Sequence, residues 1–331
     1  MHPSAESPTD AGTSKGRRSS ARRRLVVWAF STLTVGGVAW YLWSSADRLL
    51  PLIEVPMEQT LGVGLLFAVG TLLNALEFWV LYRRLGARIG VIENWLLYSA
   101  GQLLNHAPGQ VGTVYRFGYL RTVHRLSYPR AASGYGANLL LTVVSTGALG
   151  LVACLAIGVY QGIWSPILLA SFAGLLMVSL AALVVPLPTS KGQGRFARAW
   201  RGFQSGWSEV TKHTRTALIV VTIEFIKYAI LAVRMKLALS WIGIDQSYGF
   251  FLVIAAVTGL VTFLALTPAG VGLRELAIGF AASAMGVEFD LALLGATLDR
   301  AVMLVWALLI GTLGLVYTAR RMAQVSFEQS V

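Results

Sequence analysis

Two short stretches of this chain place proline, glycine and arginine inside otherwise apolar sequence, and they are where we expect chemistry. The first runs from residue 105 to 116 and contains Pro108, Gly109 and Gly112. The second runs from residue 267 to 275 and repeats the order Pro-x-x-Val-Gly, followed closely by arginine, with Pro268, Gly270 and Gly272 at its centre. Paired interruptions of membrane helices are typical of transporter substrate sites, so we predict that the two stretches form one site.

Arg116 and Arg274 each follow an interruption, where free backbone N–H groups and a new helix N-terminus favour an anion. A guanidinium adds a planar fork of donors that matches phosphate. In the alternative interpretation each arginine caps carbonyl groups of the opposite stretch, and Glu275 is a local counter-ion. The glycines are needed in both cases, for tight turns and close helix approach.

Further ionisable residues fall inside apolar runs, where each costs roughly 2.5–3.5 kcal/mol and needs a partner, a wet cavity or a route to the interface. Glu224 and Lys227 are three residues apart and are expected to neutralise each other. Arg234 is expected to extend to the nearby membrane interface. Asp299 and Arg300 point to different faces of one helix, so at least one of them should reach an interrupted stretch. The remaining members of this group are Glu77, Lys236, Arg274 and Glu275.

The composition indicates a polytopic helical membrane protein, because 56% of the 331 residues are hydrophobic and only 13% are charged. The net charge of +12 comes from short basic clusters beside apolar runs. This pattern follows the positive-inside rule and argues against nucleic-acid binding. The single cysteine, Cys154, excludes an intramolecular disulfide, and the four histidines lack metal-ligand spacing. We therefore expect no metal and no other cofactor.

The lengths of the apolar runs predict six full spans and two re-entrant, broken helical hairpins. Residues 92–106 would reach only about 22 Å as a helix, short of the roughly 30 Å hydrocarbon core. If they turn back at Pro108, the arginines that follow stay on the cytoplasmic side, and irregular backbone at that depth is tolerated where it lines a cavity. The second hairpin is predicted from residues 249–266 and 276–285. The full spans are predicted at 25–43, 61–82, 131–160, 166–185, 216–242 and 291–317.

The predicted fold class is thus an all-α polytopic membrane protein built from two inverted four-element repeats. Each repeat contains two spans, a broken hairpin and a further span; the first begins inside and the second outside. Residues 186–215 form a polar loop whose aromatics recur at helical steps, which suits either an amphipathic helix on the inner leaflet or a solvated helix. The chain lies in the cell inner membrane with both termini cytoplasmic. The predicted segments are a disordered basic tail at 1–24, a transmembrane domain at 25–320 with repeats at about 25–160 and about 166–318, and a cytoplasmic tail at 321–331.

The two interrupted stretches, together with Leu120-Arg121 and a late arginine, resemble the flippase-like membrane domain of lysylphosphatidylglycerol synthases over about residues 25–320. Thr113 stands where that family often has an acidic residue, and Ala269 replaces a frequent glycine. The chain ends at Val331, so we expect no soluble aminoacyl-transferring domain and no lysyl transfer. The resemblance implies lipid translocation, with Arg116, Arg274, Glu275 and Arg300 as the corresponding positions; we add Asn105 to this substrate-binding set.

The leading hypothesis is a flippase-type transporter that moves an anionic phospholipid or a polyprenyl-linked head group between leaflets by alternating access. It is not expected to be an enzyme, and no glycine-rich phosphate loop for ATP is present in the sequence. Two alternatives stay open. One is a membrane glycosyl- or head-group transferase that acts on a lipid phosphate through Asp47, Glu54 and Glu58. The other is an accessory scaffold for a lipid- or glycan-synthesising enzyme.

Overall fold

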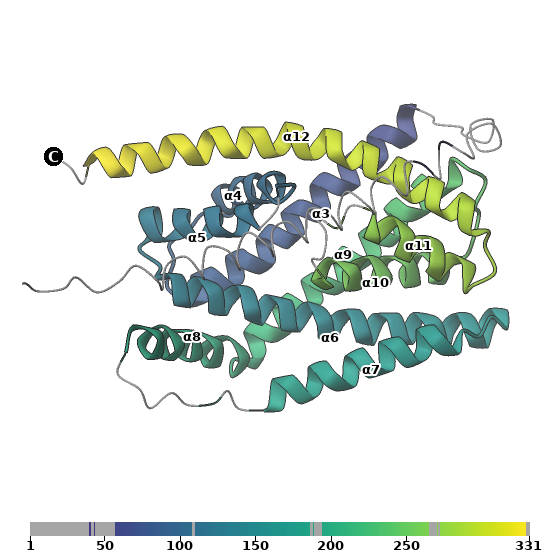
Figure 1. Ribbon diagram of the computed structural model, residues 1–331, viewed down its shortest axis with the longest axis horizontal. Coiled ribbons are helices and arrows are strands. Elements are labelled where there is room, and N and C mark those ends of the chain that lie inside the picture. The colour runs from purple at the N-terminus through teal and green to yellow at the C-terminus, as the bar shows by residue number, and fades with distance from the viewer. Residues whose placement is uncertain are drawn as a thin grey trace, which may run out of the picture.

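The computed structural model describes residues 57–107, 110–185, 188, 194–264, 270 and 272–328, together with Trp40 and Trp43. Within these residues the chain forms helices and no strand (Figure 1), as the all-α prediction requires. The helices are α3 (Met57–Arg84), α4 (Val91–Leu104), α5 (Val111–His124), α6 (Tyr128–Gln161), α7 (Pro166–Val184), α8 (Arg195–Thr211), α9 (Thr214–Ser240), α10 (Tyr248–Leu264), α11 (Leu273–Ser283) and α12 (Phe289–Glu328).

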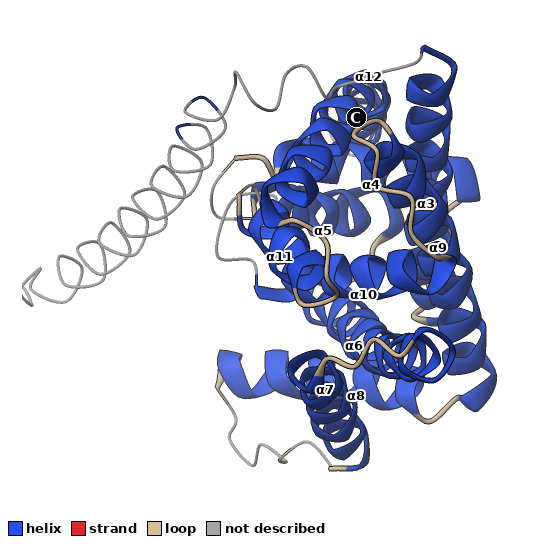
Figure 2. Cartoon of the chain, turned by 90° about the vertical axis from the view of Figure 1, so that its right-hand side faces the viewer, coloured by secondary structure: helices blue, strands red, loops and turns tan. Residues whose placement is uncertain are grey.

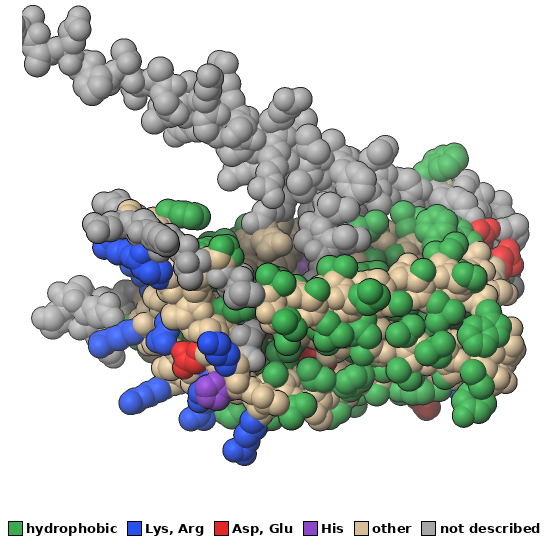
Figure 3. All heavy atoms as spheres, turned by 90° about the horizontal axis from the view of Figure 1, so that it is seen from below, with side chains coloured by type: hydrophobic (Ala, Val, Ile, Leu, Met, Phe, Trp, Pro, Cys, Tyr) green, Lys and Arg blue, Asp and Glu red, His purple; other side chains and the backbone are tan. Residues whose placement is uncertain are grey.

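Five helices are long and apolar enough to cross a membrane, namely α3, α6, α7, α9 and α12. They coincide with five of the six predicted spans; the sixth, residues 25–43, lies outside the described residues. Figure 3 shows hydrophobic side chains covering the middle of the face formed by α6 and α7, with Lys and Arg gathered at one end of the molecule. This distribution suits a bilayer, and the chain is a multi-pass membrane protein.

Two pairs of short helices occupy the positions of the predicted hairpins. In the first pair α4 and α5 run antiparallel, because Gly101 and Gly112 meet near the connection while Glu93 meets Tyr119 and His124 at the far end. Each helix has 14 residues, which corresponds to about 21 Å and is too short for a full span. In the second pair α10 packs against α11. The predicted turn residues Pro108, Gly109 and Pro268 lie outside the described residues.

The short helices are enclosed by long ones. The first hairpin helix, α4, packs along α12, whereas α10 packs along α6, and α3 packs along α9 (Figures 1 and 2). Glycine makes the approach of α4 and α12 possible, because a Cβ at Gly314 would overlap the carbonyl oxygen of Leu96. Each short pair therefore packs against membrane-length helices, and Arg116 of the first pair and Arg274 and Glu275 of the second are buried.

Two hydrophobic clusters hold the bundle together. One includes Phe250 and Phe251 of α10 and draws mainly on α6, α7, α9, α11 and α12. The other includes Tyr82 and Leu97 and draws mainly on α3, α4, α5 and α6. Side chains from both groups of helices also line a common cavity, which has both apolar and charged residues in its wall.

The polar loop predicted at residues 186–215 contains α8, which packs against α6. The Phe203 ring stacks on Trp200 and Trp207, with centroid distances of 5.6 and 6.0 Å. A Cβ at Gly136 of α6 would lie 3.5 Å from both Phe203 and Trp207, so part of the aromatic face covers α6. Phe196, at the start of α8, is 82% exposed. Contact of this helix with the inner leaflet stays a prediction.

The last helix extends beyond the predicted domain boundary. That boundary, at residue 320, falls inside α12, which continues to Glu328. Arg321 lies 3.1 Å from a carboxylate oxygen of Glu93, so the end of α12 contacts the start of α4.

Candidate functional site

A cavity of about 370 Å³ lies inside the helical bundle. Its volume is in the range of small-ligand sites. Aromatic rings such as Phe78 and Tyr98 line it beside amide and hydroxyl side chains, including Asn74, Gln102 and Thr142. The five cationic side chains in its wall are Arg116, Lys227, Arg234, Arg274 and Arg300. Ionisable groups at membrane depth are expensive, so this cavity is the candidate functional site.

Arg116 is a buried cation that forms no ion pair with any carboxylate of the described residues. Its guanidinium carbon lies 4.1 Å from the centroid of the Phe78 ring and 5.0 Å from that of Tyr98. One terminal nitrogen donates to the Tyr82 hydroxyl at 3.4 Å, whereas the buried Nε has no hydrogen-bond partner. The side chain is only 4% exposed, and no described carboxylate forms an ion pair with it. Cation–π contacts recover part of the lost hydration but leave the positive charge uncompensated.

The local fold places Arg116 at the cavity by bringing α4 and α5 into backbone contact. A Cβ at Gly112 would overlap the carbonyl oxygen of Gly101, and a Cβ at Gly101 would overlap the Arg116 side chain. Asn105 accepts a hydrogen bond from the Thr113 amide at 3.3 Å, which joins the end of α4 to the start of α5. Two small residues and one amide side chain therefore set the arginine's position.

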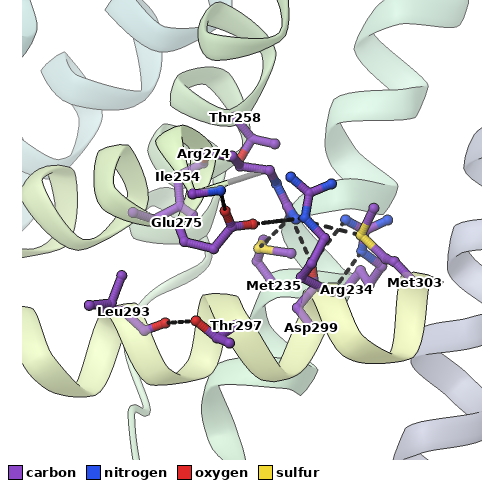
Figure 4. A network of polar contacts seen from close by, with 12 residues as sticks. Arg234, Met235, Ile254, Thr258, Arg274, Glu275, Leu293, Thr297, Asp299 and Met303 are labelled. Carbon is purple, nitrogen blue, oxygen red and sulfur yellow. Dashed lines mark hydrogen bonds and ion pairs between the residues drawn. The ribbon is translucent and has the colours of Figure 1, made fainter. Parts of the chain in front are cut away.

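Arg274 lies in a second polar cluster, formed where α9, α11 and α12 meet (Figure 4). Its Nη2 donates to Asp299 at 2.7 Å, and Arg234 Nε lies 3.1 Å from the other oxygen of the same carboxylate. Asp299 is fully buried. Arg234 was predicted to extend to the membrane interface, and this prediction is wrong: its side chain is 6% exposed because Asp299 provides a buried partner.

Glu275 lies behind the cavity wall and stabilises the same cluster. It accepts from Arg300 Nε at 2.9 Å and from the Gly272 backbone amide at 2.7 Å. Its distance to Arg274, 3.8 Å, is longer, so Asp299 and not Glu275 is the main counter-ion of Arg274. Gly272 has φ +81°, a left-handed conformation that favours glycine. The prediction that Asp299 or Arg300 reaches an interrupted stretch is confirmed for both.

A third cluster surrounds Lys227 on α9. Its Nζ lies 2.7 Å from a carboxylate oxygen of Glu224, which confirms the predicted pair. The same Nζ donates to Glu77 of α3 at 3.0 and 3.2 Å and to the amide oxygen of Asn74 at 3.1 Å. Thr142 of α6 donates to Glu224. Three helices thus converge on one ammonium group and two fully buried carboxylates.

Most of the predicted substrate-binding residues that the structure describes line the cavity. Asn105, Arg116, Arg274 and Arg300 line it, whereas Glu275 does not. Of the glycines predicted to break the hairpins, Gly270 lines the cavity, whereas Gly112 and Gly272 do not. The sequence reasoning missed Tyr98 and Gln102. These two and Asn105 recur at steps of four and three along one apolar segment, so they share a helix face, and this spacing was a usable signal.

The charges at the cavity do not cancel. The five cations of its wall face four buried carboxylates, Glu77, Glu224, Glu275 and Asp299, so one positive charge is in excess when all are ionised. Of these five cations, Arg116 is the one that forms no ion pair with a described carboxylate. Among the described residues, no group of three or more His, Cys, Asp or Glu side chains is placed to hold a metal ion. The arrangement can therefore bind an anion through guanidinium groups.

Membrane-length helices around a buried cationic cavity define a multi-pass helical membrane protein with an internal polar site. The family model described as lysylphosphatidylglycerol synthase TM region matches residues 17–311, and the chain belongs to this family. The family match confirms the resemblance drawn from the two interrupted stretches. Comparison with curated proteins gives no match.

Proposed function

We propose that this protein moves the anionic head group of a membrane lipid between leaflets, with the cavity as the head-group site. Membership of a family described by lysylphosphatidylglycerol synthase supports a membrane phospholipid as the partner. A polyprenyl-linked phosphate offers the same anionic chemistry. We expect a lipid- or glycan-synthesising enzyme that makes or uses this lipid to be a partner of the protein.

The observation that carries this proposal is the unpaired Arg116. A buried guanidinium that forms no ion pair with a described carboxylate is unfavourable in the empty site and is stabilised when an anion enters the cavity that it lines. Phosphate oxygens match its donor geometry. The rings of Phe78 and Tyr98 hold the guanidinium plane, which leaves donors for a ligand.

The packing of the helices supports two inverted repeats. When α3, α4, α5 and α6 are matched in order with α9, α10, α11 and α12, the contacts α3–α4, α4–α5 and α4–α12 correspond to α9–α10, α10–α11 and α10–α6. Exchange of the repeats preserves these contacts, as expected for repeats that rock about a shared site. We assign the two short helix pairs as re-entrant hairpins that gate the cavity from opposite sides.

The distribution of charge supports an orientation. Helix α8, which contains Arg201, and the end of α3, which contains Arg83 and Arg84, lie on the left in Figure 1, at the end where Figure 3 shows Lys and Arg. We place this end on the cytoplasmic side of the inner membrane, with both chain termini there.

Lipid movement in vesicles tests the proposal. Purified protein is reconstituted with phosphatidylglycerol that carries a fluorescent acyl chain, and the fraction accessible to an external quencher is followed in time. Arg116→Gln should slow movement roughly 10- to 100-fold, the loss expected for a charge-assisted hydrogen bond of about 1.5–3 kcal/mol. Arg121→Gln is the matched control, because Arg121 is on the same helix but is exposed and lies over the Tyr128 ring.

The specificity of the effect separates the candidate lipids. A fluorescent polyprenyl phosphate and a zwitterionic phosphatidylcholine are assayed in parallel, and whichever anionic lipid depends on Arg116 is the substrate class. Equal rates for wild type and Arg116→Gln with both anionic probes would refute the assignment of the site.

A further inference from the structure

We propose that Glu77 and Glu224 together bind one exchangeable proton beside Lys227, and that this proton moves with the anionic head group. The first half of this statement concerns a site that lipid binding does not require. The second half rests on the proposed function.

In this cluster two carboxylates compete for the hydrogen bonds of one ammonium group. Glu77 and Glu224 are both 0% exposed, and both contact the same Nζ, at 3.0 and 2.7 Å. An ammonium has three hydrogens, whereas four oxygen atoms surround it: two from Glu77, one from Glu224 and one from Asn74. Glu224 Oε2 is buried and receives no hydrogen bond of regular geometry, although it lies at ion-pair distance. One oxygen is therefore left for an additional proton.

The net charge of the cluster also favours the binding of one proton. With both glutamates ionised, two negative charges face one positive charge, and the cluster keeps a net charge of −1 away from water. Two carboxylates that share a buried site do not both ionise readily, because the second negative charge is repelled by the first and is poorly solvated. A proton on either carboxylate removes the excess charge and supplies the missing donor.

Among the described residues, no other group that faces the cluster is suited to this role. Lys227 and Tyr228 approach it from α9, Tyr98 on α4 interacts electrostatically with Lys227 and Glu77, and Arg116 on α5 lies across the Tyr98 ring. Tyrosine, lysine and arginine ordinarily keep their protons near neutral pH. From α6 the contact is the Thr142 hydroxyl, which does not titrate.

The proton has a route to water and a means of coupling. Lys227, Asn74 and Thr142 line the cavity, so the proton enters from cavity water and binds a carboxylate oxygen behind them. Lys227 and Arg116, the arginine to which we assign the anion, both line this cavity. A proton added to the cluster makes the field in the cavity more positive and so strengthens anion binding there. Binding of the proton therefore strengthens binding of the anion, and the reverse also holds. This mutual effect is needed for the two to move across the membrane together.

Infrared difference spectroscopy tests the proton site without any transport. The full-length protein in nanodiscs is titrated with acid and base, and the carbonyl band of a protonated carboxylic acid is recorded. We expect such a band near neutral pH in wild type and its loss or shift in both Glu77→Gln and Glu224→Gln. Glu209→Gln, which alters a partly exposed glutamate paired with Arg130, should leave the band unchanged. The absence of a protonated carboxylic acid in wild type, or a band unaffected by both variants, would overturn the site.

The coupling of lipid movement to proton movement is tested in vesicles that contain a pH-sensitive dye, which reports the internal pH. Movement of fluorescent phosphatidylglycerol by wild type should accelerate under an imposed proton gradient, and each glutamine variant should lose this dependence. Sodium dependence in place of proton dependence, or an unchanged response in both variants, would overturn coupling. Wild type that shows the infrared band but moves no lipid would reject the proposed function and the coupling while retaining the proton site.

Discussion

Neutralising Asp299 should destabilise the protein more than any change to an exposed charge. In the wild type Asp299 is fully buried and accepts hydrogen bonds from Arg274 at 2.7 Å and from Arg234 at 3.3 Å. Asp299→Asn keeps the size of the side chain and removes its charge. Two arginines, each less than 10% exposed, then lose their shared counter-ion.

The expected loss follows from the charge count of the cluster. Arg234, Arg274 and Arg300 carry three positive charges against two negative charges on Asp299 and Glu275, a net charge of +1. The substitution raises the net charge to +2. Removal of one partner of a buried ion pair costs about 3–5 kcal/mol, so the free energy of unfolding should fall by about that amount. Adding Arg234→Met to Asp299→Asn returns the net charge to +1 and should recover much of the loss.

Equilibrium unfolding in mixed micelles measures these differences. Asp245→Asn is the control, because its side chain is 88% exposed and lies 3.9 Å from Lys236, a surface pair worth about 0–1 kcal/mol. If Asp299→Asn unfolds within about 0.5 kcal/mol of that control, the ion pairs of the cluster do not hold α9, α11 and α12 together. If the double variant shows no recovery, the explanation by net charge is wrong.

Two further predictions concern the first hairpin. Gly112→Ala should destabilise the protein by about 1–3 kcal/mol, because its Cβ overlaps the Gly101 carbonyl oxygen. Gly118→Ala is the control: this residue is on the same helix with open space around it, so the change should be neutral or stabilising by up to about 1 kcal/mol. Equal unfolding free energies for the two variants would refute the close approach of Gly112 to Gly101. Burial raises the pKa of Glu93, but hydrogen bonds, the strongest from His124, outweigh it and lower the pKa to about 2. Because the folded pKa lies below the ordinary value of about 4.3, this contribution to stability is complete above about pH 4.3 and is lost as the pH falls toward 2. Unfolding free energies measured from pH 7 to pH 3 should therefore fall more steeply for wild type than for Glu93→Gln, and parallel curves would contradict this.

The sequence by itself determined the membrane class, five of the spans that the structure describes and the position of the short helices. Hydropathy and segment length decide these features locally, because each span must cover the hydrocarbon core with its own residues. It also pointed to Arg116 and Arg274, because cations beside glycine-rich interruptions stand out against apolar sequence. Arg300 was identified as a charge inside an apolar run and through the family resemblance.

Only the tertiary structure decided which charges compensate one another. Arg234 was placed at the interface because it lies near the end of its span, yet α12 brings Asp299 to it. Arg116 and Arg274 occupy similar positions in the two stretches, but the second has a buried carboxylate and the first has aromatic rings. The physical reason is that an ion pair depends on which helix faces meet, and residues far apart in the chain supply the two partners. That difference leaves Arg116 as the charge available to a ligand.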